Sequence, residues 1–118
     1  MSKGKTIALW TVSILLAAMF VFAGSTKLLS PAQAKEGFVH YGYAAWFATF
    51  IGVCEALGGL GLLLPRLAGL AATGLAIIMA GAVFTHFSHH EYAHGMIPLT
   101  LLVFLIGVAY VRFTAPKA

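Results

Sequence analysis

Residues 44–87 have the sequence AAWFATFIGVCEALGGLGLLL-PR-LAGLAATGLAIIMAGAVFTHF, in which two apolar runs flank Pro65 and Arg66. At about 1.5 Å of rise per residue, each run is long enough to cross the roughly 30 Å hydrocarbon core of a bilayer as a helix. Similar apolar runs precede and follow this region. The sequence therefore predicts an all-α integral membrane four-helix bundle in a single domain, residues 1–118, with helices at 6–29, 44–64, 67–87 and 97–113.

The composition excludes a water-soluble fold of this size. Of 118 residues, 61% are hydrophobic and 8% are charged, whereas a soluble domain has about a quarter of its residues charged. The net charge of +4 comes from seven scattered Lys and Arg residues, without the basic stripe that nucleic-acid binding requires. The lipid bilayer is therefore the expected partner, and nucleic acid is not.

The segment between the first two apolar runs predicts a short interfacial helix at residues 31–41. Ser30 and Pro31 are typical of a helix start, and Gly42 is typical of a stop. The first run follows Lys3 and Lys5 and also resembles a secretory signal peptide, but we expect it to remain as a membrane helix. Basic residues favour cytoplasmic termini, since only Lys27 and Lys35 would then face outward, and the inner side would carry Lys3, Lys5, Arg66, Arg112 and Lys117.

Glu55 is the strongest functional candidate, because it lies near the middle of the second apolar run. A carboxylate at that depth is costly unless it is protonated, paired or exposed to a watery cavity. Lys27 is its natural cationic partner, and His86 and Tyr41 are candidates for the mouth of an outward-facing pocket. The alternative is that Glu55 only locks the bundle through a hydrogen bond or ion pair.

Small residues recur every four positions in the second run, at Ala48, Gly52 and Ala56, and Gly58, Gly59 and Gly61 follow. Small residues on one helix face allow close approach of a neighbouring helix, so tight packing is the simplest interpretation. The alternative is that the glycines leave room for a flat ligand.

The third connection is rich in histidine. His86, His90 and His94 follow i, i+4 spacing, so a continuing helix would place three imidazoles on one side, where they could bind zinc, nickel or copper. His90-Glu91-Tyr92-Ala93-His94 also matches the H-E-x-x-H pattern of zinc proteases. The context is poor for a protease, because Gly95 and Pro98 follow and no further acidic or histidine ligand lies downstream. A polar loop is the simpler interpretation.

The single cysteine, Cys54, excludes an internal disulfide, a CxxC redox pair and a cysteine-based zinc cluster. Phosphate-binding glycine loops and activated serine nucleophiles are also absent from the sequence. Any redox chemistry therefore requires a bound cofactor or a partner protein.

Four stretches stand out by their order and spacing: Phe22–Leu28, Gly37–Tyr43, Ile51–Gly59 running to Arg66, and Ala82–His86. Together they resemble the DoxX-like family of small bacterial four-helix membrane proteins. The resemblance implies a bundle in the bacterial cytoplasmic (inner) membrane, with Lys27, Glu55 and His86 at the family's usual polar positions. It also suggests sulfur and thiol redox work, since better-understood relatives include a membrane subunit of a thiosulfate:quinone oxidoreductase. The segment His89–His94 lies outside the resemblance.

These observations lead to one main hypothesis and two alternatives. The main hypothesis is an accessory or quinone-linked redox subunit with an outward-facing polar pocket around Glu55, working with a redox or membrane-complex partner. The first alternative is a non-enzymatic scaffold or anchor for a partner complex, including a homo-oligomer. The second is a metal-handling protein that uses the outer histidines.

Overall fold

The structure, a computed structural model, describes residues 1–115, so Lys117 of the predicted inner side lies outside the described residues. The chain forms five helices: α1 (Lys3–Leu29), α2 (Pro31–His40), α3 (Ala45–Gly61), α4 (Ala68–Ser88) and α5 (Tyr92–Thr114). No strand occurs in this range, and the apolar helices confirm the predicted all-α membrane bundle.

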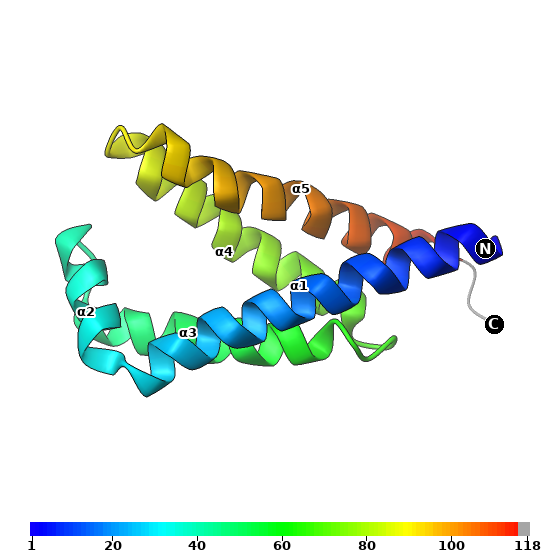
Figure 1. Ribbon diagram of the computed structural model, residues 1–118, viewed down its shortest axis with the longest axis horizontal. Helices are drawn as coiled ribbons and strands as arrows, with labels where there is room; N and C mark the ends of the chain where they lie inside the picture. The colour runs from blue at the N-terminus through cyan, green and yellow to red at the C-terminus, as the bar shows by residue number, and fades with distance from the viewer. Residues whose placement is uncertain (116–118) are drawn as a thin grey trace.

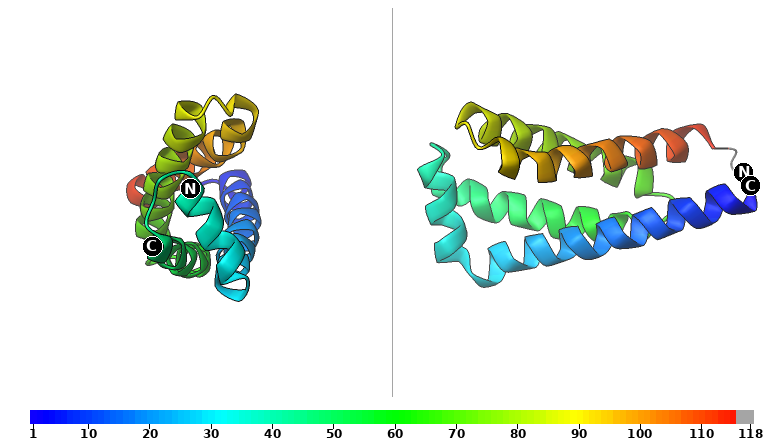
Figure 2. Two further views of the ribbon diagram at one scale, coloured as in Figure 1. Left: turned by 90° about the vertical axis from the view of Figure 1, so that its left-hand side faces the viewer. Right: turned by 45° about the horizontal axis from the view of Figure 1, so that its top comes forward.

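The helices form two pairs, α1 with α3 and α4 with α5. Figure 1 shows that the pairs lie close together where α1 begins and α5 ends, and diverge toward α2. We call these the terminal end and the α2 end. Figure 2 shows α2 lying across the end of the α1–α3 pair. The divergence leaves space between the pairs at the α2 end.

By length and composition, α1, α4 and α5 could each cross a membrane. Helix α3 has 17 residues, which is near the lower limit for a span of about 17–25 residues. A fourth crossing is counted when α2 and α3 are taken together as one span bent by 116°. The bend occurs at Gly42, whose φ of +91° suits glycine.

Three predicted helix bounds differ from the structure by three residues or more, and the others agree to within one residue. Helix α1 begins at Lys3 because Ser2 caps it, accepting a hydrogen bond from the backbone N–H of Lys5. Helix α3 ends at Gly61 instead of residue 64, since the late glycines weaken the helix and Pro65 disfavours helical backbone before it. Helix α5 begins at Tyr92 instead of residue 97. Pro98 lies inside α5, which a membrane helix tolerates.

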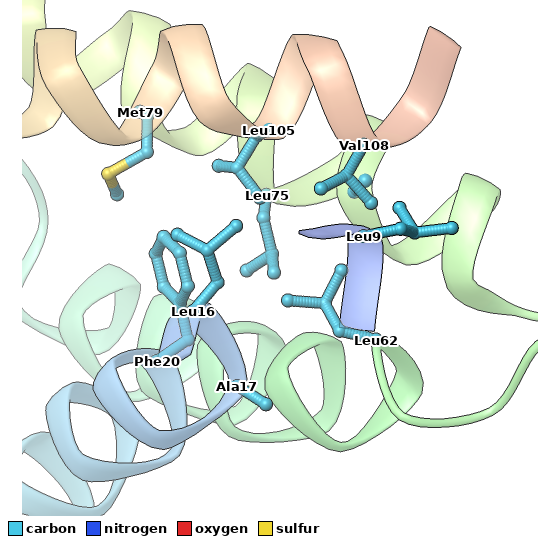
Figure 3. Packing of buried hydrophobic residues seen from close by; sticks show 10 residues of the cluster. Leu9, Leu16, Ala17, Phe20, Leu62, Leu75, Met79, Leu105 and Val108 are labelled. Carbon is cyan, nitrogen blue, oxygen red and sulfur yellow. The ribbon is translucent and has the colours of Figure 1, made fainter. Parts of the chain in front are cut away.

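The apolar core joins the two pairs from the terminal end to the middle of the bundle. Figure 3 shows side chains from α1, from the end of α3, from α4 and from α5 converging there. The fully or nearly fully buried members are Leu9, Leu16, Ala17, Phe20, Leu62, Ala72, Leu75, Met79, Leu105 and Val108. This packing holds the pairs together at the terminal end. The core does not reach the α2 end, where other contacts must connect the pairs.

Glycines set the close approach of α1 to α3. A Cβ added at Gly24 would lie 2.5 Å from the carbonyl oxygen of Gly52 and 2.6 Å from the backbone nitrogen of Ala56. A Cβ at Gly59 would lie 3.0 Å from the backbone of α1 at Ala17. The space beside these glycines is occupied by atoms of the neighbouring helix. This confirms the interpretation of the small residues as positions of close helix packing.

We therefore expect Gly24→Ala to destabilise the protein by about 1–3 kcal/mol, because the added methyl meets backbone atoms that cannot rotate away. Thermal unfolding in detergent measures the change. Gly74→Ala is the matched control, since a Cβ there meets nothing within 4 Å and alanine favours a helix over glycine by up to about 1 kcal/mol. Equal effects of the two substitutions would contradict the packing argument.

Candidate functional site

A cavity of about 520 Å³ lies where the two helix pairs diverge. It is lined by residues of all five helices and of the turn after α2, and most of its wall is aliphatic or aromatic. The polar members are Lys27, Tyr41, Tyr43, Glu55, Thr85 and His86. The structure thus places all four residues predicted for a pocket, Lys27, Tyr41, Glu55 and His86, around one cavity.

An ion pair between Lys27 and Glu55 forms one side of the cavity. The Lys27 Nζ atom donates to Glu55 Oε1 at 2.7 Å, and the side chains are 23% and 4% exposed. The glycine contact between α1 and α3 creates this pair, because Lys27 follows Gly24 by three residues and Glu55 follows Gly52 by three. The mutual neutralisation offsets the cost of a carboxylate at this depth.

The ion pair keeps hydrogen-bonding capacity that faces the cavity. An ammonium group has three N–H donors, and within residues 1–115 its one acceptor is Glu55 Oε1. Two donors therefore remain for a ligand oxygen. In an apolar surrounding such charge-assisted hydrogen bonds are stronger than in water.

Aromatic side chains form the wall beside the pair. Phe47 and Phe50 are stacked, with ring centroids 5.9 Å apart and an interplanar angle of 21°. Phe38 packs against Phe47 edge to face at 6.0 Å. On the opposite wall Gly81 leaves open space, because a Cβ there would meet nothing within 4 Å. The cavity is therefore suited to a flat, largely apolar ligand with a polar edge.

Two tyrosines close the cavity at the α2 end, and we call their contacts the tyrosine clasp. The Tyr41 hydroxyl donates to Glu91 Oε1 at 2.6 Å, and His86 Nδ1 lies 2.8 Å from the same oxygen. The Tyr43 hydroxyl shares a hydrogen bond with the Thr85 hydroxyl. Because α2 itself packs only against α1 and α3, the clasp joins the α2 end of one helix pair to the other.

The clasp depends on the ionised form of Glu91, which lies in the turn between α4 and α5. Hydrogen bonds from Tyr41 and then from His86 hold the pKa of the Glu91 carboxyl below its ordinary value of 4.5. The same Glu91 contact raises the pKa of the Tyr41 hydroxyl. Protonation of Glu91 therefore weakens the clasp.

The histidines predicted as metal ligands do not gather. Helix α4 ends at Ser88 and His90 adopts a φ of +60°, so no continuing helix stacks the three imidazoles on one side. His90 Nδ1 instead pairs with the Tyr92 hydroxyl at 3.0 Å. Only His86 and His94 stay close, with ring centroids 6.2 Å apart. Within residues 1–115 no group of three or more metal-binding side chains is arranged around a common point.

The H-E-x-x-H pattern also fails on geometry. That motif requires both histidines on one helix face, whereas α5 begins at Tyr92 and leaves His90 and Glu91 outside it. The carboxylate of Glu91 is occupied by Tyr41 and His86.

The prediction from sequence missed Tyr43, Thr85, Glu91 and the aromatic wall. A signal was available for the wall, because Phe47, Ile51 and Glu55 recur every four residues and so share one face of α3. Glu91 is one of only three acidic residues in the chain. Its role as the acceptor of the clasp depends on a contact with Tyr41, fifty residues away in sequence, which no local pattern reveals.

Comparison with known proteins adds one decisive match. The family model described as the DoxX-like family matches residues 11–108. The chain belongs to the DoxX-like family. The matched region of this DoxX-like protein contains every residue of the ion pair and of the tyrosine clasp. No curated protein and no solved structure matches the chain.

Removing one member of the ion pair should destabilise this DoxX-like protein. We expect Lys27→Gln or Glu55→Gln alone to cost about 3 kcal/mol, because each leaves a charge of low exposure without its partner. The double substitution should cost less than the sum of the two single ones. Thermal unfolding of all four proteins measures this coupling, and strictly additive effects would contradict a direct pair.

The clasp should give the DoxX-like protein a stability that falls in acid. A carboxyl whose pKa is lowered by folding stabilises the fold above its ordinary value near 4.5 and loses that contribution as the pH falls through the folded-state pKa. Melting temperature measured across this range should therefore drop for the natural protein and drop less for Glu91→Gln. Glu36→Gln, an exposed carboxyl in α2, is the control and should keep the natural profile.

Proposed function

We propose that this DoxX-like protein is an accessory membrane subunit that binds a lipid-soluble, quinone-type ligand in the cavity and serves redox chemistry there. The observation that carries the proposal is the Lys27–Glu55 ion pair, set in a cavity whose remaining wall is mostly aliphatic and aromatic. Pockets for small ligands are typically apolar, with a few polar groups that fix orientation.

The residues present fit the chemistry of such a ligand. The free donors of Lys27 would bind a carbonyl oxygen at the ring edge, and the stacked rings of Phe47 and Phe50 would flank the ring. Glu55 would hold or release a proton beside that oxygen. A bound quinone supplies two-electron redox chemistry. Since Cys54 is the single cysteine, electrons would come from a redox partner protein in the membrane.

The cavity is placed for entry from the bilayer. Phe50, Ile77 and Ile97 line it and are 52%, 70% and 62% exposed, so its rim is apolar and faces the surroundings of the bundle. A ligand dissolved in the hydrocarbon would enter past these side chains without crossing water. The tyrosine clasp closes the aqueous side.

We further propose the bacterial cytoplasmic (inner) membrane, with both termini in the cytoplasm. Among the described residues, Lys3, Lys5, Arg66 and Arg112 are on the segments at the terminal end, and Lys27 and Lys35 are toward the α2 end. This distribution follows the positive-inside rule. The clasp then faces outward.

Filling the cavity tests the proposal. We expect the natural protein, extracted in mild detergent, to carry a quinone-type molecule that mass spectrometry of the extract identifies. Gly81→Leu should remove it, because Gly81 lines the cavity and a larger side chain there has open space to occupy. Gly74→Leu is the matched control, since it is equally open but lies outside the cavity lining. Equal ligand content in both variants would refute the assignment of the cavity.

Glu55→Gln separates this function from a scaffold role. The scaffold alternative is favoured by one observation, that the ion pair is complete within the chain. If the protein is a scaffold, Glu55→Gln should change its stability or the amount of partner that co-purifies with it, where the partner includes a second copy of the chain. The amount of bound ligand should stay unchanged. The redox proposal requires a change in ligand content or in proton-coupled turnover.

A further inference from the structure

A second hollow lies at the opposite end of the bundle, and we call it the terminal groove. It has a volume of about 560 Å³ and runs between the first half of α1 and the last half of α5. Its lining is Met1, Lys5, Ala8, Leu9, Val12, Val103, Phe104, Gly107, Val108, Tyr110, Val111, Thr114 and Ala115. None of these residues lines the cavity around Glu55.

The shape of the terminal groove suits a hydrocarbon chain. Helices α1 and α5 touch along only part of their length, and they pack more extensively against α3 and α4. Gly107 adds space, since a Cβ there would meet nothing within 4 Å. Most of the lining is aliphatic, and Lys5 supplies the charged group. A long apolar chain in the groove would therefore have a cation near one end.

The charge at the terminal end lacks a counterion among the side chains. The whole sequence has three acidic residues, and all lie elsewhere: Glu36 in α2, Glu55 within α3 and Glu91 in the turn after α4. The terminal end carries several basic residues, namely Lys3, Lys5, Arg66 and Arg112. An anionic ligand at this end would therefore meet basic groups that no described acidic side chain neutralises.

Arg112 shows the same shortage of acceptors. Its guanidinium lies over the Trp10 ring, 5.0 Å from the centroid. Its Nε and Nη2 atoms are buried and have no hydrogen-bond partner within residues 1–115. Buried donors are normally satisfied, so this end of the bundle is short of anionic or polar acceptors.

We infer that the terminal groove is a binding site for an anionic phospholipid, with an acyl chain against Gly107 and the phosphate bound by Lys5. Basic residues at a membrane surface attract anionic headgroups, and the length of α1 brings Lys3 and Lys5 to that surface. A second copy of the chain fits less well, because a symmetric contact at this groove would bring like charges together.

The test compares two lipids of matched acyl chains, phosphatidylglycerol and phosphatidylcholine, added to the full-length protein in detergent. Native mass spectrometry counts the lipid that each protein retains. We expect the natural protein to retain one phosphatidylglycerol and to prefer it over phosphatidylcholine by about fivefold, which is the effect of roughly one basic residue at the surface.

Four variants locate the site. Gly107→Leu fills the groove and should abolish retention, and Lys5→Gln should remove the preference for phosphatidylglycerol. Gly74→Leu and Lys35→Gln are the controls and should match the natural protein. Because Lys5 is exposed, its substitution tests the site even where Gly107→Leu fails to fold. Equal retention of both lipids by the natural protein, an unchanged preference for phosphatidylglycerol in Lys5→Gln, or a second protein copy in place of lipid would overturn the inference.

Discussion

The Lys27–Glu55 ion pair is the interaction on which the arrangement of the site depends. Its 2.7 Å contact lies one helical turn beyond the place where α1 and α3 meet closely at Gly24 and Gly52, which allow that approach because neither carries a Cβ. The same contact makes a carboxylate tolerable near the middle of an apolar helix. Packing and electrostatics therefore meet at one place, since the glycine contact and the ion pair are each made by the same two helices, three residues apart along each.

The remaining architecture follows from how the second helix pair meets the first. Large aliphatic side chains join α4 and α5 to α1 at the terminal end. Toward α2 the pairs diverge around the cavity, and polar side chains form the connection there. A cavity at this position receives its polar groups from α1, α3 and the clasp, and its apolar wall from residues that face the membrane. Because these elements contribute different side chains, charged groups and apolar side chains line the same cavity.

The sequence predicted the helical membrane bundle and the interfacial helix because those features depend on local periodicity and on stop signals such as Gly42 and Pro65. It also predicted Lys27 as the partner of Glu55, because so few charges were available for pairing. The three histidines of the third connection do not stack, since the chain reverses after Ser88 and His90 takes a left-handed backbone conformation. The clasp could not be predicted, because Tyr41 and Glu91 meet only through the tertiary fold.

The two ends of the bundle are held together by different kinds of contact, and they should therefore differ in how easily they open. At the terminal end the pairs are joined by packed apolar side chains that carry no ionisable group. At the α2 end they are joined by a few hydrogen bonds for which water competes. We therefore expect thermal motion to separate the pairs first at the α2 end, because the buried core that includes Leu62 and Leu105 holds them together at the other. A separation at that end would widen the cavity, because the cavity lies between the two pairs where they diverge.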